Sequence, residues 1–173
     1  FLRGDGGDGT AVHGTIFVSG DAHGNLGSDV VESVAALAGY RPGPVTRNPR
    51  NGSTVENERA GYVHSTTGNT AAVNARARSV AVEFAPSSMG RGGADELVKN
   101  GKPSSSFGSQ VAAARSLESL LAGLNPNMQF LEWVDHGYGI VDLTEERAIF
   151  EFWWQDKLTP DAPDVLGMQM VTW

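Results

Sequence analysis

Apolar residues form short runs near the start and in the last third of the chain, with one helical stretch between them. Residues 15–18 and 80–84 are rich in β-branched and aromatic side chains, a composition typical of buried strands. Between Ser109 and Gly123 the apolar residues recur at helical spacing. This spacing predicts a helix that Gly123 terminates.

Apolar runs in the last third of the chain have the length and composition of strands: 128–134, 138–143, 148–154 and 165–173. Because short gaps separate them, we expect antiparallel pairing, with 135–137 in the hairpin between the first two. In the third run Phe150, Phe152 and Trp154 alternate with their neighbours. One face of this strand should therefore be aromatic and packed in the core.

The pattern at 28–39 fits two elements. Valines, alanines and a leucine at helical spacing predict a helix that Ser28 or Asp29 caps and Gly39 ends. A strand through Val30 and Val31, followed by a loop, is the alternative. Residues 40–70 carry several prolines and glycines and show no periodicity. We interpret this excursion as a lid or binding loop, with His64 as a loop histidine.

Length and composition bound the class of protein. With 173 residues, 40% of them hydrophobic, the chain can form one domain with a sizeable core. The net charge of −7 argues against a nucleic-acid groove, which requires clustered Lys and Arg. No cysteine is present, so disulfides and thiolate ligands are excluded within the chain. No apolar run approaches the about 20 residues of a membrane-spanning helix.

The first residues indicate that the chain is a piece of something longer. Residues 1–3 resemble the last turn of a helix, and Gly4 resembles its stop. Residues 4–14 form a flexible loop rich in glycine and aspartate, of the kind that proteases cut. Spaced aspartates can also bind calcium, but the loop lacks the regular spacing and the bidentate Glu of a known calcium loop. A solvated linker is the preferred interpretation.

Candidate chemistry follows the strand at 15–18. Gly20 breaks the run, and Asp21 and His23 follow two residues apart. Side chains at i and i+2 of an extended segment point the same way, so both could reach one metal ion or two adjacent ions. Gly24, Asn25 and Gly27 should keep the next turn free of bulk, so that a ligand can approach the backbone. An ordinary polar turn at the strand end remains the alternative.

Two weaker candidates lie at other strand ends. Ser87, Ser88 and Arg91 could hydrogen-bond an anion, although a capped turn explains the serines equally well. His136 beside Asp135 suggests an imidazole oriented by a carboxylate, as in the outer shell of a metal site. A polar hairpin turn is the alternative there.

Four segments together resemble PhoD-like alkaline phosphatases and phosphodiesterases. They contain the strand with its Gly-Asp-x-His ending, a strand with trailing serines and glycines, an Asn-Pro-Asn turn, and a His-Gly-Tyr strand that continues into Phe-Trp-Trp. In this sequence they are 15–25, 80–93, 124–128 and 136–154. They occur in the same order as in that family, and the likeness extends from residue 15 to about residue 170.

The resemblance implies an α/β fold: part of a metallophosphoesterase-type β-sandwich flanked by helices (α/β/β/α), antiparallel in its C-terminal third. Residues 15–173 would be the C-terminal part of such a domain. The Asp and His of the family motif are metal ligands and map onto Asp21 and His23. The family's other ligands lie upstream of this chain's sequence. The metals implied are Fe3+ and Ca2+, and other divalent ions also suit these ligand types.

The function implied by the resemblance is hydrolysis of phosphate mono- or diesters by a metal-activated water or hydroxide. The partner implied is the N-terminal part of the same protein, as a second chain after cleavage, in the periplasm or outside the cell. Two other functions remain open: a non-catalytic member of the same fold that binds a ligand or partner, and a freestanding β-rich binding module.

Overall fold

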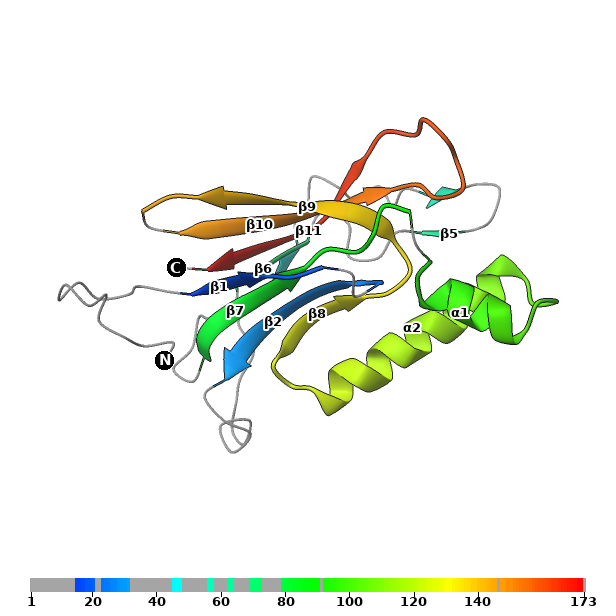
Figure 1. Cartoon of the computed structure of the whole chain (residues 1–173), viewed down its shortest axis with the longest axis horizontal. Coiled ribbons are helices and arrows are strands. Elements are labelled where there is room, and N and C mark those ends of the chain that lie inside the picture. Colours follow the sequence, from blue (N-terminus) through cyan, green and yellow to red (C-terminus); the bar gives the residue numbers. More distant parts are fainter. Residues whose placement is uncertain are drawn as a thin grey trace.

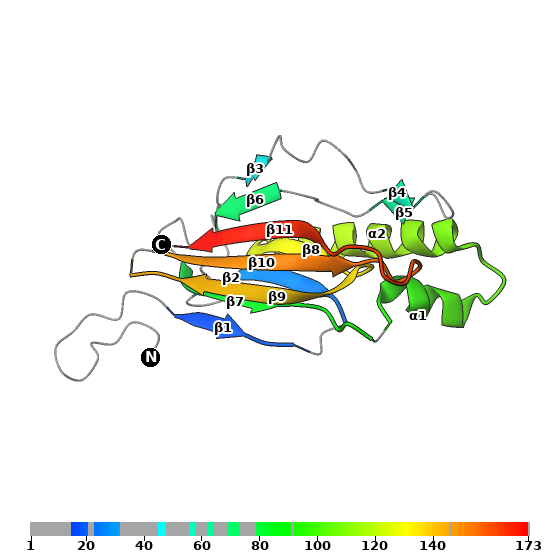
Figure 2. The same cartoon turned by 90° about the horizontal axis from the view of Figure 1, so that it is seen from above.

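The structure is a computed structural model that describes residues 15–20, 23–31, 45–47, 56–57, 62–63, 69–72, 79–90, 92–145 and 147–172. Within these ranges the chain is mixed α/β and consists mostly of strands, arranged in two larger sheets and a small hairpin. Figures 1 and 2 show the two larger sheets facing each other, with helices beside one of them. The sequence predictions for 1–14, 32–39 and His64 lie outside the described residues.

The first sheet has four strands, in the order β1-β7-β2-β8. They are β1 (Ile16–Val18), β7 (Ser79–Ala85), β2 (Asn25–Val31) and β8 (Met128–Glu132). β1 pairs parallel with β7, whereas β2 is antiparallel to both β7 and β8. Hence β1, β7 and β8 all run in the same direction, and their carboxyl ends lie at one end of the sheet.

The second sheet has five strands, in the order β3-β6-β11-β10-β9. They are β3 (Val45–Arg47), β6 (Asn69–Ala72), β11 (Val165–Thr172), β10 (Ala148–Gln155) and β9 (His136–Leu143). β9, β10 and β11 are antiparallel, as predicted for the last third, and β6 is parallel to β11. The hairpin is β4 (Glu56–Asn57) and β5 (Tyr62–Val63). The excursion at 40–70 thus contains short strands that its prolines and glycines did not predict.

The core lies between the two sheets and is largely aromatic. The first sheet contributes Val82, Phe84 and Phe130, and the second contributes Phe150, Phe152, Trp154, Met168 and Met170. The rings of Phe84 and Phe150 stack across the interface with centroids 4.6 Å apart. Every second residue of β10 is buried, which confirms the predicted aromatic face.

Two helices lie together beside β8: α1 (Ala94–Gly101) and α2 (Phe107–Leu124) (Figure 1). α2 is the helix predicted from the apolar spacing, and Ser106 caps its start by accepting a hydrogen bond from the amide of Ser109. α1 was not predicted. No helix in the described ranges is long and apolar enough to cross a membrane.

The predicted helix over 28–39 is wrong for residues 28–31. These residues belong to β2, which has β7 on one side and β8 on the other. The alternative strand through Val30 and Val31 is therefore correct. β-branched side chains favour a central strand of this kind, and two ladders of main-chain hydrogen bonds outweigh a weak helical spacing.

The predicted hairpin at 135–137 is also wrong. β8 pairs with β2 in the first sheet, whereas β9 pairs with β10 in the second. The chain crosses between the sheets after Glu132, and His136 is the first residue of β9. A short connection is compatible with a hairpin but also with a change of sheet, and the pairing of β8 with β2 and of β9 with β10 shows that the chain changes sheet.

We predict that Phe152→Ala lowers the free energy of unfolding by about 3–5 kcal/mol, because it leaves a cavity in the aromatic core. Leu120→Ala is the matched control: the Leu120 side chain is exposed on α2, and its loss should cost less than about 0.5 kcal/mol. Urea unfolding of both variants measures the difference. Equal destabilisation would contradict the described core.

Candidate functional site

Strand directions bring several connections to one end of the sandwich. β1, β7 and β8 end there, and β2 and β9 begin there. β10 also ends there, since Gln155 pairs with His136. In sheets that contain parallel strands, ligands bind outside the carboxyl ends of those strands. The residues of these connections therefore form the candidate site.

His23 lies in the β1–β2 connection, one of the sequence-predicted sites. Its Nδ1 is 3.1 Å from the carbonyl oxygen of Gly92 in the β7–α1 connection. A carbonyl oxygen only accepts, so Nδ1 carries a proton and is the donor in this contact. Metal-binding histidines are commonly held in this way. His23 also has a φ of 53°, a conformation that non-glycine residues rarely adopt.

Asp21 lies outside the described residues, so its position relative to His23 remains a prediction. The expectation that Gly24 and Gly27 leave room for a ligand is wrong. A Cβ on Gly24 would overlap the indole of Trp133, and one on Gly27 would overlap the sulfur of Met170. Both glycines are needed because protein side chains fill that space, and Gly27 belongs to β2 rather than to a turn.

Glu132 at the end of β8 ties these connections together. Its carboxylate is fully buried and accepts hydrogen bonds from Nδ2 of Asn25 (2.9 Å) and from the amides of Val134 (2.9 Å) and Asp135 (2.8 Å). Nη1 of Arg115 on α2 donates a further bond of 2.6 Å. A buried carboxylate is tolerated only when it is paired and hydrogen-bonded, and Glu132 satisfies both conditions.

Asn25 extends this network to the β7–α1 connection. Its Oδ1 accepts from the amide of Ser87 at 2.9 Å, and its Nδ2 donates to the carbonyl of Asp135 at 3.1 Å. The Ser87 hydroxyl donates to that same carbonyl, and the Ser88 hydroxyl accepts from the amide of Gly90. These serines bind the protein's own backbone, which favours the capped turn over the anion site. Arg91 lies outside the described residues.

Asp135 does not orient His136. Its carboxylate lies 3.4 Å from Nη2 of Arg115, an arginine that also binds Glu118 at 2.9 Å. The prediction failed because adjacent residues of extended chain point in opposite directions. The carboxylate nearest to His136 belongs instead to Glu96 on α1, at 3.7 Å from Nε2.

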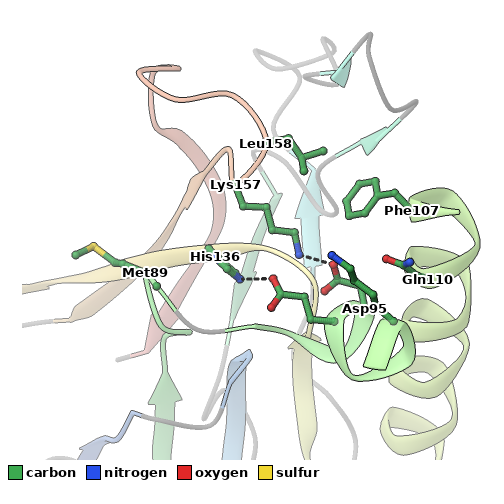
Figure 3. Close-up of a pocket in the computed structure, with 10 residues that line it drawn as sticks. Met89, Asp95, Phe107, Gln110, His136, Lys157 and Leu158 are labelled. Carbon is green, nitrogen blue, oxygen red and sulfur yellow. Dashed lines mark hydrogen bonds and ion pairs between the residues drawn. The ribbon is translucent and has the colours of Figure 1, made fainter. Parts of the chain in front are cut away.

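His136 lines a cavity of about 420 Å³ between α1, the start of α2, the start of β9 and the β10–β11 connection (Figure 3). Lys157 crosses this cavity. Its Nζ donates to Asp95 at 2.6 Å and to the carbonyl of Val134 at 2.8 Å, and it lies 5.7 Å from the centre of the Phe107 ring. The buried ion pair thus joins α1, the β8–β9 crossover and the β10–β11 connection.

Two buried polar atoms of the cavity have no hydrogen-bond partner among the described residues: Oδ1 of Asp95 and Nε2 of His136. Burial, and then the charge of Lys157, lower the pKa of His136, so that its ring is neutral at pH 7. Asp95 and Lys157 were not predicted from the sequence. The only local signal for Asp95 was the acidic pair after the glycines at 92–93, and that pair does not indicate Lys157.

No group of three or more His, Cys, Asp or Glu side chains that could hold a metal ion occurs among the residues whose placement is described. The comparisons with known proteins add no relative: no family model, no curated protein and no solved structure matches this chain. The function of the chain therefore has to be inferred from the site itself and from the resemblance of the four sequence segments.

We predict that Glu132→Gln lowers the free energy of unfolding by about 3 kcal/mol, since it removes the charge that faces Arg115 and replaces an acceptor with a donor. Glu145→Gln, at an exposed position of the β9–β10 connection, is the control and should have little effect. Chemical denaturation followed by circular dichroism compares the two. A neutral effect of Glu132→Gln would refute the role of this carboxylate.

The lowered pKa of His136 makes stability depend on pH. The unfolded chain binds a proton at His136 below about pH 6.5, whereas the folded chain resists it, so stability falls as the pH drops below that value. Lys157 opposes protonation, and Glu96, Asp95 and Glu132 favour it less strongly than burial disfavours it. His136→Gln should flatten the pH dependence below about pH 6.5. Urea unfolding at several pH values measures this slope, and an unchanged slope would contradict the assignment.

Proposed function

We propose that this chain is the C-terminal portion of a metal-dependent phosphoesterase that hydrolyses phosphate mono- or diesters. The observation that carries the proposal is the imidazole of His23, which lies at the carboxyl ends of β1 and β7 with its Nδ1 proton donated to Gly92. Metal-binding histidines commonly donate one ring nitrogen to a backbone carbonyl in this way, which fixes the orientation of the ring. The four PhoD-like segments support the same function.

The donor types fit the implied metals in part. An imidazole nitrogen from His23 and a carboxylate from Asp21 suit iron and other transition metals, and the carboxylate also suits Ca2+. Two ligands do not complete a site, so the remaining ligands would come from an N-terminal portion. When bound, the metals would supply Lewis-acid polarisation of the phosphoryl group and acidify the attacking water.

The chain's own residues hold this ligand in place. Gly92 fixes the ring of His23, and the network of Glu132 and Asn25 ties together the connections on either side of it. Trp133 packs where Gly24 has no side chain. A pre-organised ligand loses less freedom when the metal binds, so this network supports metal affinity.

The exposed sheet edges support a second polypeptide as the partner. β1 forms one edge of the described four-stranded sheet, and its Phe17 and Val18 side chains are 43% and 58% exposed. Figure 2 shows β9 on the same side of the sandwich, where Ile140 and Leu143 are also exposed. Open edges with apolar side chains favour pairing with further strands. We infer that the N-terminal portion docks there. The resemblance to the PhoD-like family further implies that the protein works in the periplasm or outside the cell.

The test uses the protein together with any second polypeptide that copurifies with it. His23→Ala and Asp21→Ala should each lower metal affinity at least about tenfold and reduce hydrolysis of an aryl phosphate correspondingly. Glu145→Ala, at an exposed position of the β9–β10 connection, is the control. Elemental analysis and a phosphatase assay provide the two measurements. A protein without bound metal, whose activity survives Asp21→Ala, would refute the proposal.

A ligand-binding function without catalysis is the second candidate. The cavity lined by His136 and Asp95 favours it, since two polar atoms there have no hydrogen-bond partner within the described ranges, whether or not a metal binds near His23. A complete set of upstream metal ligands in the same protein would decide in favour of the enzyme.

A further inference from the structure

We propose that the cavity between α1, the start of β9 and the β10–β11 connection binds a hydroxyl-rich group, a polyol or a sugar moiety. Nothing in the resemblance assigns a ligand to this cavity. The inference rests on two buried polar atoms that lack a hydrogen-bond partner among the described residues, on the balance of charge around them, and on the apolar residues beside them.

The first support is the pair of unpartnered atoms. The side chain of Asp95 is almost completely buried, and nine-tenths of the His136 side chain is buried. Oδ1 of Asp95 and Nε2 of His136 have no hydrogen-bond partner in the part of the chain that is described. Such atoms are costly in a native fold, and each calls for a bound water, ion or ligand.

The second support is the hydrogen-bonding chemistry. Oδ2 of Asp95 accepts a hydrogen bond from Nζ of Lys157, and a carboxylate oxygen such as Oδ1 is a hydrogen-bond acceptor. The ligand must therefore donate there. A hydroxyl group donates to a carboxylate and can either donate to or accept from an imidazole, so it satisfies both atoms whichever tautomer His136 adopts.

The third support is the balance of charge. The cavity is lined by two cations, Lys99 and Lys157, and by two anions, Asp95 and Glu96. The lysines would repel a cationic ligand, and the carboxylates would repel an anionic ligand. A neutral ligand with several hydroxyls avoids both penalties.

Size and surface agree with this class. A volume of about 420 Å³ lies within the roughly 300–1,000 Å³ range of small-molecule pockets. Phe107, Leu158 and Met89 line the cavity with apolar atoms that can contact the C–H groups of a sugar or polyol (Figure 3).

Glu96 lies beside His136. Its Oε1 is 3.7 Å from Nε2 of His136, a separation too long for a strong hydrogen bond. The Glu96 side chain is 44% exposed. It can therefore rotate into solvent when a ligand hydroxyl replaces it beside Nε2.

The hydroxyl group could come from two sources. The first source rests on the proposed phosphoesterase function. The hydroxyl group then belongs to the alcohol portion of the ester, since the cavity lies at the same end of the sandwich as His23. Otherwise it belongs to a free polyol that binds independently of any reaction.

The direct test is an NMR titration of the protein, with any copurifying polypeptide, by myo-inositol in the absence of added metal. Cyclohexanol, which has the same ring size but one hydroxyl, is the matched control probe. We expect a saturable shift of the His136 imidazole signals with inositol and at most a weak one with cyclohexanol. No shift up to the solubility limit of inositol, or equal shifts with both probes, would overturn the proposal.

Two variants sharpen the test. His136→Gln should weaken inositol binding at least tenfold, whereas Lys102→Gln, at an exposed position just after α1, should leave it unchanged. Circular dichroism shows whether each variant folds. The wild-type titration decides the matter even where His136→Gln does not fold, and unaltered binding by a folded His136→Gln would also overturn the proposal.

The source of the hydroxyl group is decided by kinetics. A higher KM of His136→Gln for a sugar phosphate, with an unchanged KM for phenyl phosphate, identifies the alcohol portion of the ester. Weaker inositol binding with unchanged KM values identifies a free polyol. Because the inositol titration needs neither metal nor activity, its failure and the failure of the phosphoesterase function are separate outcomes.

Discussion

The buried carboxylate of Glu132 is the interaction on which the candidate site depends. It lies where β8 ends and the chain crosses to the second sheet, and it binds the first amides of that crossover, Asn25 at the start of β2, and Arg115 on α2. An ionised group there is costly unless every oxygen lone pair is used. The carboxylate therefore holds three separate connections in one arrangement. The positions of the His23 ring and of the cavity beside His136 depend on this arrangement.

Much of the fold could be predicted from local pattern. The alternation at Phe150, Phe152 and Trp154 requires one buried face, and the strand has that face. Long-range pairing decided the rest. The valines of β2 suit a helix or a strand, and only the presence of β7 and β8 on either side selects the strand. α1 was missed because it is short and mostly polar, so it depends on packing rather than on its own periodicity.

The site was predictable to the extent that its chemistry is local. His23 follows a strand and a glycine, and this order alone marks it as a candidate. The ion pair of Asp95 and Lys157 joins residues 62 positions apart, and no local pattern relates them. The adjacency of Asp135 and His136 led to a wrong prediction of contact between them. Asp135 faces Arg115, whereas His136 faces Glu96. The contact partners of two adjacent side chains on extended chain have to be assigned from the packing of the sheet, not from the adjacency of the residues in sequence.

The most direct test of the central claim is the protonation state of His23 before and after a metal is added. Long-range 1H–15N NMR of the imidazole distinguishes the two ring nitrogens, and Zn2+ serves as a diamagnetic probe. In the complete protein the account predicts a proton on Nδ1 throughout, and a shift of the Nε2 resonance when Zn2+ binds. A proton on Nε2, or an Nε2 resonance that Zn2+ leaves unchanged, would contradict it.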